Sequence, residues 1–187
     1  MSRAARFARQ AIRSCRRLAS DDRGVSAVEF AMLLPLMLTL YLGTVEISQG
    51  IGADRKVTLT ARSVADLVAQ VTSVNNAEMT NSLNAAAAVM APYSTSNLKV
   101  VVTSVSIDGN SKVTVDWSKT LNGTARSTGS VVTLPTALTV PNTSLIWSEV
   151  TYTYKPVIGY VVSGTLTLKD QIYMRPRLSD KVLWSTS

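Results

Sequence analysis

The sequence predicts an α+β fold: one N-terminal transmembrane helix continuing into a stalk helix, then a second amphipathic helix, then an antiparallel sheet of about four strands. Three observations support this prediction. No residue from Phe30 to Val45 is charged. Apolar residues then recur every three or four positions as far as Met90, and every two positions from Leu98 onward. A chain of 187 residues has room for the membrane helix and one modest domain.

The apolar run predicts a membrane-spanning helix over residues 25–46. From Val25 to Val45 a helix would extend about 32 Å, which matches a bilayer core of about 30 Å. The run is apolar all round and follows a basic segment, so a membrane span is favoured over a buried core helix. We expect Pro35 to kink this helix because proline removes a backbone donor.

Glu29 is the only charged residue between Gly24 and Glu46. An ionisable residue at mid-bilayer costs about 2.5–3.5 kcal/mol on insertion scales, and such residues are usually functional. Glu29 lies only about 6 Å along the helix from Val25, however, so its carboxylate can also extend to the lipid headgroups. Position alone leaves both interpretations open.

Residues 1–24 form a basic leader. Seven of the 19 lysines and arginines fall in the first 23 residues, against two acids, so removing residues 1–24 leaves 12 basic and 10 acidic residues and lowers the net charge from +7 to +2. Lysine and arginine concentrate on the cytoplasmic side of membranes, which predicts a cytoplasmic leader and an extracytoplasmic α+β domain over residues 47–187. Because the basic excess lies in the leader, we expect no nucleic-acid partner for the domain.

The composition of the leader leaves one other targeting signal open. Its arginines recur at spacings of three and four, so as a helix it would be basic and amphipathic and would bind anionic lipid. A mitochondrial presequence has the same composition and stays an alternative. A secretory signal peptide is disfavoured because no small-x-small cleavage site follows the apolar run. The only cysteine, Cys15, lies in the leader, so the domain has no disulfide.

The chemistry of common enzyme sites is missing from the sequence. The chain has no histidine, which excludes His-dependent triads and His-ligated zinc. It also has no glycine-rich phosphate-binding motif. We therefore predict a protein that is not an enzyme, with no catalytic residues, no metal, no cofactor and no small-molecule substrate.

Two helices are predicted ahead of the sheet. The first continues from the membrane with one apolar face, formed by Ile47, Ile51, Val57, Ala61, Val64, Val68 and Val71. A bend, or a break into two helices, at Gly50 or Gly52 is the alternative. The second helix begins at a capping box formed by Asn75 and Glu78 and is ended by Pro92. Its apolar face comprises Met79, Leu83, Ala86 and Met90.

Four alternating segments predict strands over Leu98–Ile107, Val113–Trp117, Glu149–Tyr154 and Leu166–Met174, the first two joined by a turn at Asp108-Gly109-Asn110. The residues expected to share one face within each strand are Val101, Thr103, Val105 and Ile107; Val113, Val115 and Trp117; Val150, Tyr152 and Tyr154; and Leu166, Leu168, Ile172 and Met174. Asp170 interrupts the last set and predicts either an inward-facing charge on an edge strand or a bulge. Residues 120–144 are rich in Thr, Ser, Gly and Pro and predict a long loop.

The stretch from Gly24 to Phe30, a glycine followed five residues later by a glutamate and then an aromatic residue, resembles a type IV prepilin processing site. The wider wording Gly-Val-Ser-Ala-Val-Glu-Phe-Ala-Met-Leu-Leu-Pro-Leu resembles the TadE/TadG-like pseudopilins of the tight-adherence (Tad) pilus. The closing Met174-Arg-Pro-Arg177 is similar to the C-terminal end of the same family, although less specifically.

The resemblance implies that a membrane prepilin peptidase cuts between Gly24 and Val25. The new ammonium group on Val25 would then lie near Glu29 of the same chain or of a neighbouring subunit, with Phe30 beside it in the assembly motif. It further implies a single-pass protein of the bacterial inner membrane with a periplasmic or extracellular domain. Membrane lipid, the peptidase, other pilins or pseudopilins and Tad assembly proteins are the implied partners.

The favoured function is therefore that of a minor pseudopilin or assembly protein of a Tad-type (type IVc) pilus. The main alternative is an uncleaved single-pass envelope protein whose outer domain binds another surface or secretion component, as in the TadG branch. A mitochondrial inner-membrane protein is the third possibility, and it would be cleaved elsewhere in the leader. The N-terminal residue of the mature chain distinguishes these three functions.

Overall fold

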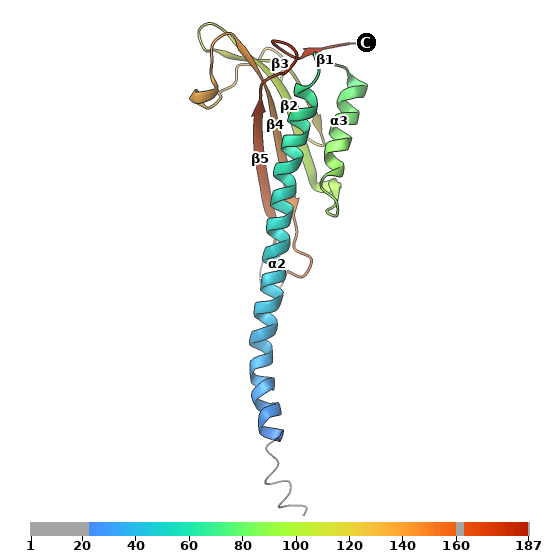
Figure 1. The fold of residues 1–187 in the computed structure, drawn as a ribbon, viewed down its shortest axis with the longest axis vertical. Coiled ribbons are helices and arrows are strands. Elements are labelled where there is room, and N and C mark those ends of the chain that lie inside the picture. Colours follow the sequence, from blue (N-terminus) through green and yellow to red (C-terminus); the bar gives the residue numbers. More distant parts are fainter. Residues whose placement is uncertain (1–22, 160–162, 187) are drawn as a thin grey trace, which may run out of the picture. The chain divides into compact units, whose positions relative to one another are not determined.

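The computed structural model describes residues 23–159 and 163–186, and for Arg23 only the backbone. The predicted leader, with Cys15, therefore lies outside the described residues apart from Arg23 and Gly24. The chain divides into two compact units, residues 1–45 and 46–187, which we describe separately. The elements are α2 (Arg23–Ala69), β1 (Ser73–Val74), α3 (Asn76–Ala88), η1 (Thr95–Asn97), β2 (Leu98–Ile107), β3 (Val113–Leu121), η2 (Thr136–Leu138), β4 (Thr143–Tyr154), β5 (Leu166–Met174) and β6 (Leu183–Trp184). The predicted α+β class and order of elements are confirmed (Figure 1).

The helix α2 continues through Gly50 and Gly52, so the predicted alternative of two helices broken at these glycines is wrong. A Cβ atom at Gly52 would lie 2.9 Å from the Tyr93 hydroxyl. That hydroxyl donates a 2.9 Å hydrogen bond to the carbonyl of Gln49. Glycine at position 52 therefore allows close approach of the segment after α3 and does not interrupt the helix.

The buried face of α2 in the second unit is formed by residues no more than 1% exposed: Ala53, Val57, Ala61, Val64, Ala65, Val68 and Ala69. The prediction is wrong for Ile47 and Ile51, whose side chains are 54% and 51% exposed, and for Val71, which follows the end of α2 and is 37% exposed. Stepping back from Val57 by four and then three positions gives Ala53 and Gly50. The buried stripe thus continues in small residues, which an apolar pattern does not single out.

The capping box predicted for α3 is present. The Asn75 side chain accepts a 2.9 Å hydrogen bond from the Glu78 amide, and the Glu78 carboxylate accepts one of 3.0 Å from the Asn75 amide. The four residues predicted for the apolar face are all buried: Met79, Leu83, Ala86 and Met90. The helix ends at Ala88, four residues before Pro92, because the last turns tighten to i→i+3 hydrogen bonds.

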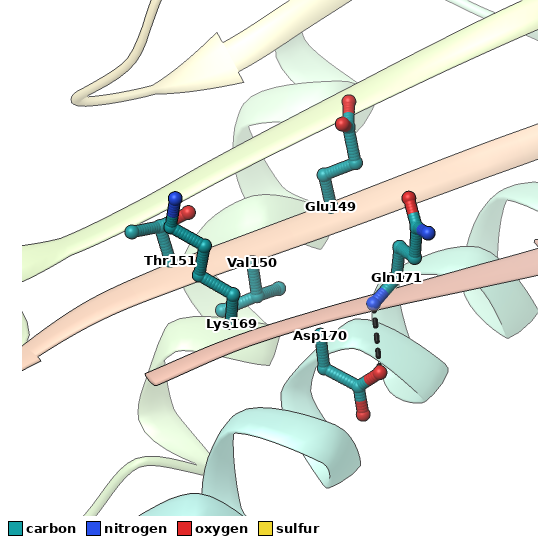
Figure 2. Close-up of a pocket in the computed structure, with 6 residues that line it drawn as sticks. All are labelled: Glu149, Val150, Thr151, Lys169, Asp170 and Gln171. Atoms are coloured by element: carbon teal, nitrogen blue, oxygen red, sulfur yellow. Dashed lines mark hydrogen bonds between the residues drawn. The ribbon is translucent and has the colours of Figure 1, made fainter. Parts of the chain in front are cut away.

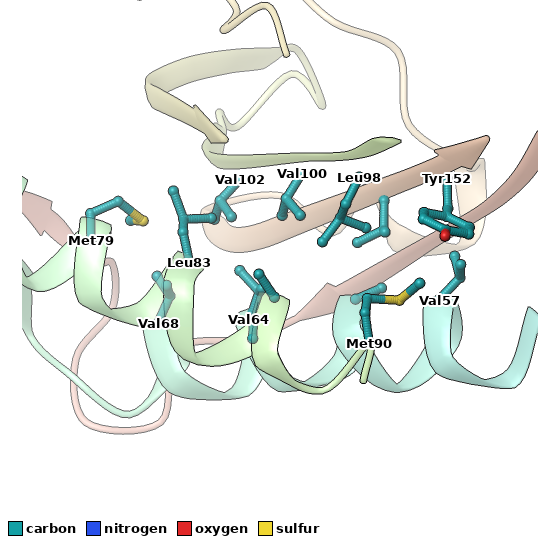
Figure 3. Close-up of a cluster of buried hydrophobic side chains, with 14 of the residues drawn as sticks. Val57, Val64, Val68, Met79, Leu83, Met90, Leu98, Val100, Val102 and Tyr152 are labelled. Carbon is teal, nitrogen blue, oxygen red and sulfur yellow. The ribbon is translucent and has the colours of Figure 1, made fainter. Parts of the chain in front are cut away.

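The main sheet has the order β3-β2-β4-β5, and every neighbouring pair is antiparallel. The second-unit part of α2 and the helix α3 cover one of its faces (Figure 3). Leu98, Val100 and Val102 of β2 point from the sheet toward these helices and are fully buried. Burying each such side chain stabilises the fold by about 1.5–3 kcal/mol. The core of the domain therefore contains Leu98, Val100 and Val102. These residues alternate along β2 with the residues that the sequence predicted for its apolar face.

A bulge makes β3 change faces along its length. The register of β3 against β2 shifts after Ser104 and leaves Asp116 without a counterpart. One extra residue reverses the face on which later side chains point. Trp117 consequently lies in the core beneath the helices, whereas Val113 and Val115 lie in the cluster on the opposite face. The prediction that these three residues share a face is wrong.

The loop predicted over residues 120–144 is shorter, because β3 extends to Leu121 and β4 begins at Thr143. It covers part of the sheet face opposite the helices. Leu134 in this loop is buried, and Val131 forms a bridge with Thr114 of β3. The buried residues of this second cluster are Val105, Ile107, Val113, Val115, Leu134, Leu145 and Trp147. The loop thus protects an apolar patch from water.

Asp170 lies on β5, an edge strand of the sheet. The β4–β5 register has no shift and places Asp170 opposite Val150, on the side of the sheet where α2 lies (Figure 2). The bulge interpretation is therefore wrong, and the inward-facing position is confirmed. Its carboxylate accepts a 2.7 Å hydrogen bond from the amide of Gln171.

The C-terminal segment returns to the end of α2, an arrangement that the sequence did not predict. The strands β1 and β6 form a two-residue parallel pair. The Arg177 amide donates a 2.9 Å hydrogen bond to the Ala69 carbonyl, and the Arg177 guanidinium forms an ion pair with Asp66. Trp117 donates its indole N–H to the carbonyl of Val182 over 2.8 Å. Strands of two residues are too short to show a period in the sequence.

Tyr154 lies in the core with a phenolic oxygen that has no hydrogen-bond partner in the described part of the chain. Burial, followed by the charges of Tyr93 and Glu46, raises the pKa of Tyr154 above its ordinary value of 10.0. The unfolded chain therefore loses this proton first as the pH rises. The associated stability is complete below about pH 10 and is lost above it.

We expect Tyr154→Phe to preserve or raise the free energy of unfolding at neutral pH, because it removes an unpaired buried hydroxyl. It should also reduce the loss of stability above pH 10. Urea unfolding, followed by tryptophan fluorescence at neutral pH and above pH 10, measures the free energy of unfolding under both conditions. Tyr173→Phe is the matched control, because the pKa of Tyr173 is also raised by burial but its hydroxyl donates a 3.3 Å hydrogen bond to Gln171. Greater destabilisation by Tyr154→Phe than by the control at neutral pH would contradict the expectation.

Candidate functional site

The N-terminal part of α2 is a helix with apolar side chains on all sides. Among the described residues, only this helix is long and apolar enough to cross a membrane, and its most apolar stretch is not buried. Exposed fractions reach 77% at Met32 and 67% at Tyr41. The other large apolar side chains exposed before Val45 are Val25, Val28, Phe30, Leu33, Leu34, Leu36, Met37, Leu38 and Leu40. The alternative of a buried core helix is therefore wrong for this segment.

Gly24 is the second residue of α2. Apart from its chain neighbours and the backbone of its own helix, no described residue has an atom within 4 Å of the position that a Cβ would occupy there. A glycine inside a helix destabilises it by about 1 kcal/mol relative to alanine. Within the described residues, neither packing nor backbone geometry requires glycine at position 24, in contrast to position 52.

Glu29 and Val25 are four residues apart on α2, so their side chains lie on one face of the helix, about 6 Å apart at Cβ. Both are exposed, as is Phe30. No ion-pair partner of Glu29 is found over residues 23–159 and 163–186. The segment thus presents a free carboxylate next to the residue that would carry a new N-terminus.

Pro35 lies inside α2 and leaves the carbonyl of Ala31 without its usual amide donor. The hydroxyl groups of two threonines in the same segment form hydrogen bonds within the helix. Thr39 donates to the carbonyl of Pro35 over 2.9 Å, and Thr44 donates to that of Leu40 over 2.8 Å. These hydroxyls therefore need no partner from water, which suits an apolar surrounding. The kink at Pro35 stays a prediction.

The sheet face opposite the helices carries a polar cluster in the second unit. The Arg126 guanidinium lies 3.8 Å from the ring centre of Trp147, forms an ion pair with Glu149 and donates a 3.2 Å hydrogen bond to Thr103. Trp147 stacks on Tyr173 with ring centres 5.5 Å apart. Sequence reasoning missed this cluster, because Arg126 lies in a loop without periodicity.

Two shallow polar grooves adjoin that cluster, with volumes of about 430 and 540 Å³. Glu149 and Thr151 line both, and Figure 2 shows the first of the two grooves. Lys169 and Gln171 complete the first, and Lys99 and Arg126 contribute to the second. No group of three or more acidic or cysteine side chains with metal-site geometry occurs among the residues that the structure describes.

The comparisons with known proteins concern the apolar part of α2. A sequence model of the TadE-like protein family matches residues 24–66, beginning at Gly24. No curated protein and no solved structure matches the chain. The match associates the chain with the Tad pilus, and the single N-terminal apolar helix fits a single-pass membrane anchor. Residues 24–66 therefore match the TadE-like family, as the motif from Gly24 to Phe30 predicted.

Proposed function

We propose that this protein is a minor pseudopilin or assembly protein of a Tad-type pilus. Residues 25–46 anchor it in the bacterial inner membrane, with the leader in the cytoplasm, until a prepilin peptidase cleaves between Gly24 and Val25. The observation that carries the proposal is the TadE-like match, which begins at the glycine of this bond. Structural, non-catalytic work fits a chain without histidine.

The environment of Gly24 supports cleavage at this position. Among the described residues nothing fills the space that a side chain would take at Gly24, so packing does not account for the glycine. A peptidase that must accommodate the backbone on the amino side of the cut bond would require it.

After cleavage, the ammonium group of Val25 and the carboxylate of Glu29 offset each other's charge in a low-dielectric layer. The pairing can form within one chain or between neighbours, and the second case sets the axial register of adjacent helices. The exposed apolar side chains around α2 supply the packing surface when the helix leaves lipid for a filament or an initiation complex.

The test is the N-terminus and intact mass of the chain from native membranes, with and without an active prepilin peptidase. We expect a chain starting at Val25 only when the peptidase is active. A Gly24→Leu variant, which the fold accommodates, should keep its leader even with active peptidase. A chain that starts near Met1 in both strains would refute the cleavage.

Glu29→Ala should leave membrane insertion intact and lower the number of assembled pili several-fold, because the register pairing is lost. Carbonate-resistant membrane association and pilus counts measure the two effects separately. Glu29→Asp is the matched control, since it keeps a carboxylate at the same position of α2 and should preserve piliation. Normal piliation of the Glu29→Ala strain would argue against the register role.

The polar grooves near Glu149 favour a second candidate function, that of an uncleaved anchored protein which binds another envelope component through its outer domain. Their lining mixes both charges on an open sheet face. An uncleaved chain that co-purifies with an envelope partner, lost on Lys169→Glu, would support it.

A further inference from the structure

The domain carries an apolar groove beside the first residues of its helix. This groove, of about 300 Å³, takes most of its apolar lining from Ile47 and Ile51 of α2, from Pro156, and from Leu166 and Leu168 of β5. Glu46, Gly50, Asp54 and Tyr154 complete the lining. Ile47, Ile51 and Leu166 are between 41% and 54% exposed. Isolated exposed apolar side chains are ordinary, but a contiguous set marks an interaction surface.

The loop after β4 extends this apolar surface. It begins with exposed Lys155 and buried Pro156, and the next two residues, Val157 and Ile158, are 85% and 47% exposed. Residues that leave a strand at a turn are usually polar or glycine. Two large apolar side chains at the surface of such a loop, next to an apolar groove, indicate a surface that is covered by an apolar partner.

The position of the groove along the chain indicates what covers it. Val45 ends the predicted span, and Gly50, in the groove lining, follows five residues later, about 8 Å of helix. The headgroup layer on each side of a bilayer is about 5–8 Å thick. Residues 46–50 therefore lie at headgroup depth when the helix spans. Asp54, the groove's exposed carboxylate, follows about 14 Å after Val45, beyond that layer.

We propose that the groove rim and the segment Pro156–Ile158 dock on the outer surface of the membrane, at the boundary between headgroups and acyl chains. The proposal rests on the membrane span within the proposed function and adds a second lipid contact, made by the domain itself. Ile47, Val157 and Ile158 enter the boundary, Ile51 lies at the outer edge of the headgroup layer, and Lys155 meets the lipid phosphates.

Lipid is favoured over a second copy of the chain as the occupant because it is present at this depth whenever the helix spans the bilayer. A neighbouring copy would have to displace it. The docked surface also explains why these side chains stay apolar, while the exposed side of the neighbouring strand β5 carries Lys169 and Gln171.

The test uses the full chain with Cys15→Ser, reconstituted in vesicles of phosphatidylethanolamine and phosphatidylglycerol. Single cysteines at Val157, Leu38 or Leu178 carry an environment-sensitive fluorophore. Nitroxides attached to the lipid at shallow or deep positions quench it. Leu38 reports on the span, and Leu178 is the matched control, because it is an apolar residue of the domain that is 67% exposed.

We expect the Val157 label to be quenched several-fold more by the shallow nitroxide than the Leu178 label, with emission shifted to shorter wavelength. The Leu38 label should be quenched best by the deep nitroxide. Deep quenching at Leu38 without quenching at Val157 would overturn the docking and leave the span intact. Loss of quenching at Leu38 would overturn the span and the docking with it. A shifted Val157 emission that depends on protein density and not on the nitroxide would assign the groove to a second copy and overturn the proposal.

Discussion

Leu38→Arg is expected to keep most of the chain out of the membrane. Leu38 lies near the middle of the predicted span, and its side chain is 48% exposed on an all-apolar helix. On insertion scales, replacing leucine by arginine near the helix centre costs about 3–4 kcal/mol. A free-energy change of that size shifts a partition roughly 100-fold or more. The fraction of chain resistant to carbonate extraction measures the effect.

Leu178→Arg serves as the control because Leu178 is 67% exposed and belongs to the second unit. It introduces the same charge and should leave extraction unchanged. Equal loss from the membrane in both variants would show that added charge alone, and not its place in the helix, causes release. Full retention of the Leu38→Arg chain would contradict the assignment of this segment as the span.

Leu98→Ala is expected to produce the largest loss of domain stability. Leu98 is fully buried on the central strand β2 and faces the helices in the main core. Truncating a buried leucine to alanine typically costs about 2–5 kcal/mol, from lost burial and from the cavity that remains. Since a domain is stable by only about 5–15 kcal/mol, the variant should unfold at a visibly lower denaturant concentration.

The measurement is fluorescence-detected unfolding of the full chain in detergent. All three tryptophans, Trp117, Trp147 and Trp184, lie in the second unit, so the signal reports on the domain alone. Lys99→Ala is the control at the next position, where the side chain is exposed, and should change stability by less than about 0.5 kcal/mol. A Leu98→Ala variant as stable as this control would remove Leu98 from the core.

Local signals in the sequence were sufficient for most of the fold. The capping box at Asn75 involves residues three positions apart, and its apolar face repeats with the helical period, so both could be read directly. The strands with clear alternation were located for the same reason. The resemblance at Gly24 and Glu29 likewise rests on a short contiguous motif, which the family match confirms.

What was missed depends on contacts between distant segments. Trp117 changes face because of a bulge at Asp116, and nothing in the alternation of β3 announces the extra residue. Arg126 gains its role only by lying over Trp147, which is distant in the sequence. The burial of Leu134 depends on the return of its loop across the sheet. The roles of Glu29 and Phe30 depend on other molecules and stay predictions.

The pairing of β1 with β6 has a mechanical consequence. The strand β1 follows α2 almost directly, and β6 is the last strand of the described chain. In a parallel pair, tension applied between α2 and the C-terminal end pulls the two strands lengthwise past each other. The hydrogen bonds from Leu183 to Thr72 and from Ser185 to Val74, of 3.0 and 2.9 Å, then bear the force together and do not open one after the other. A tether that loads its bonds simultaneously resists rupture better than one that unzips.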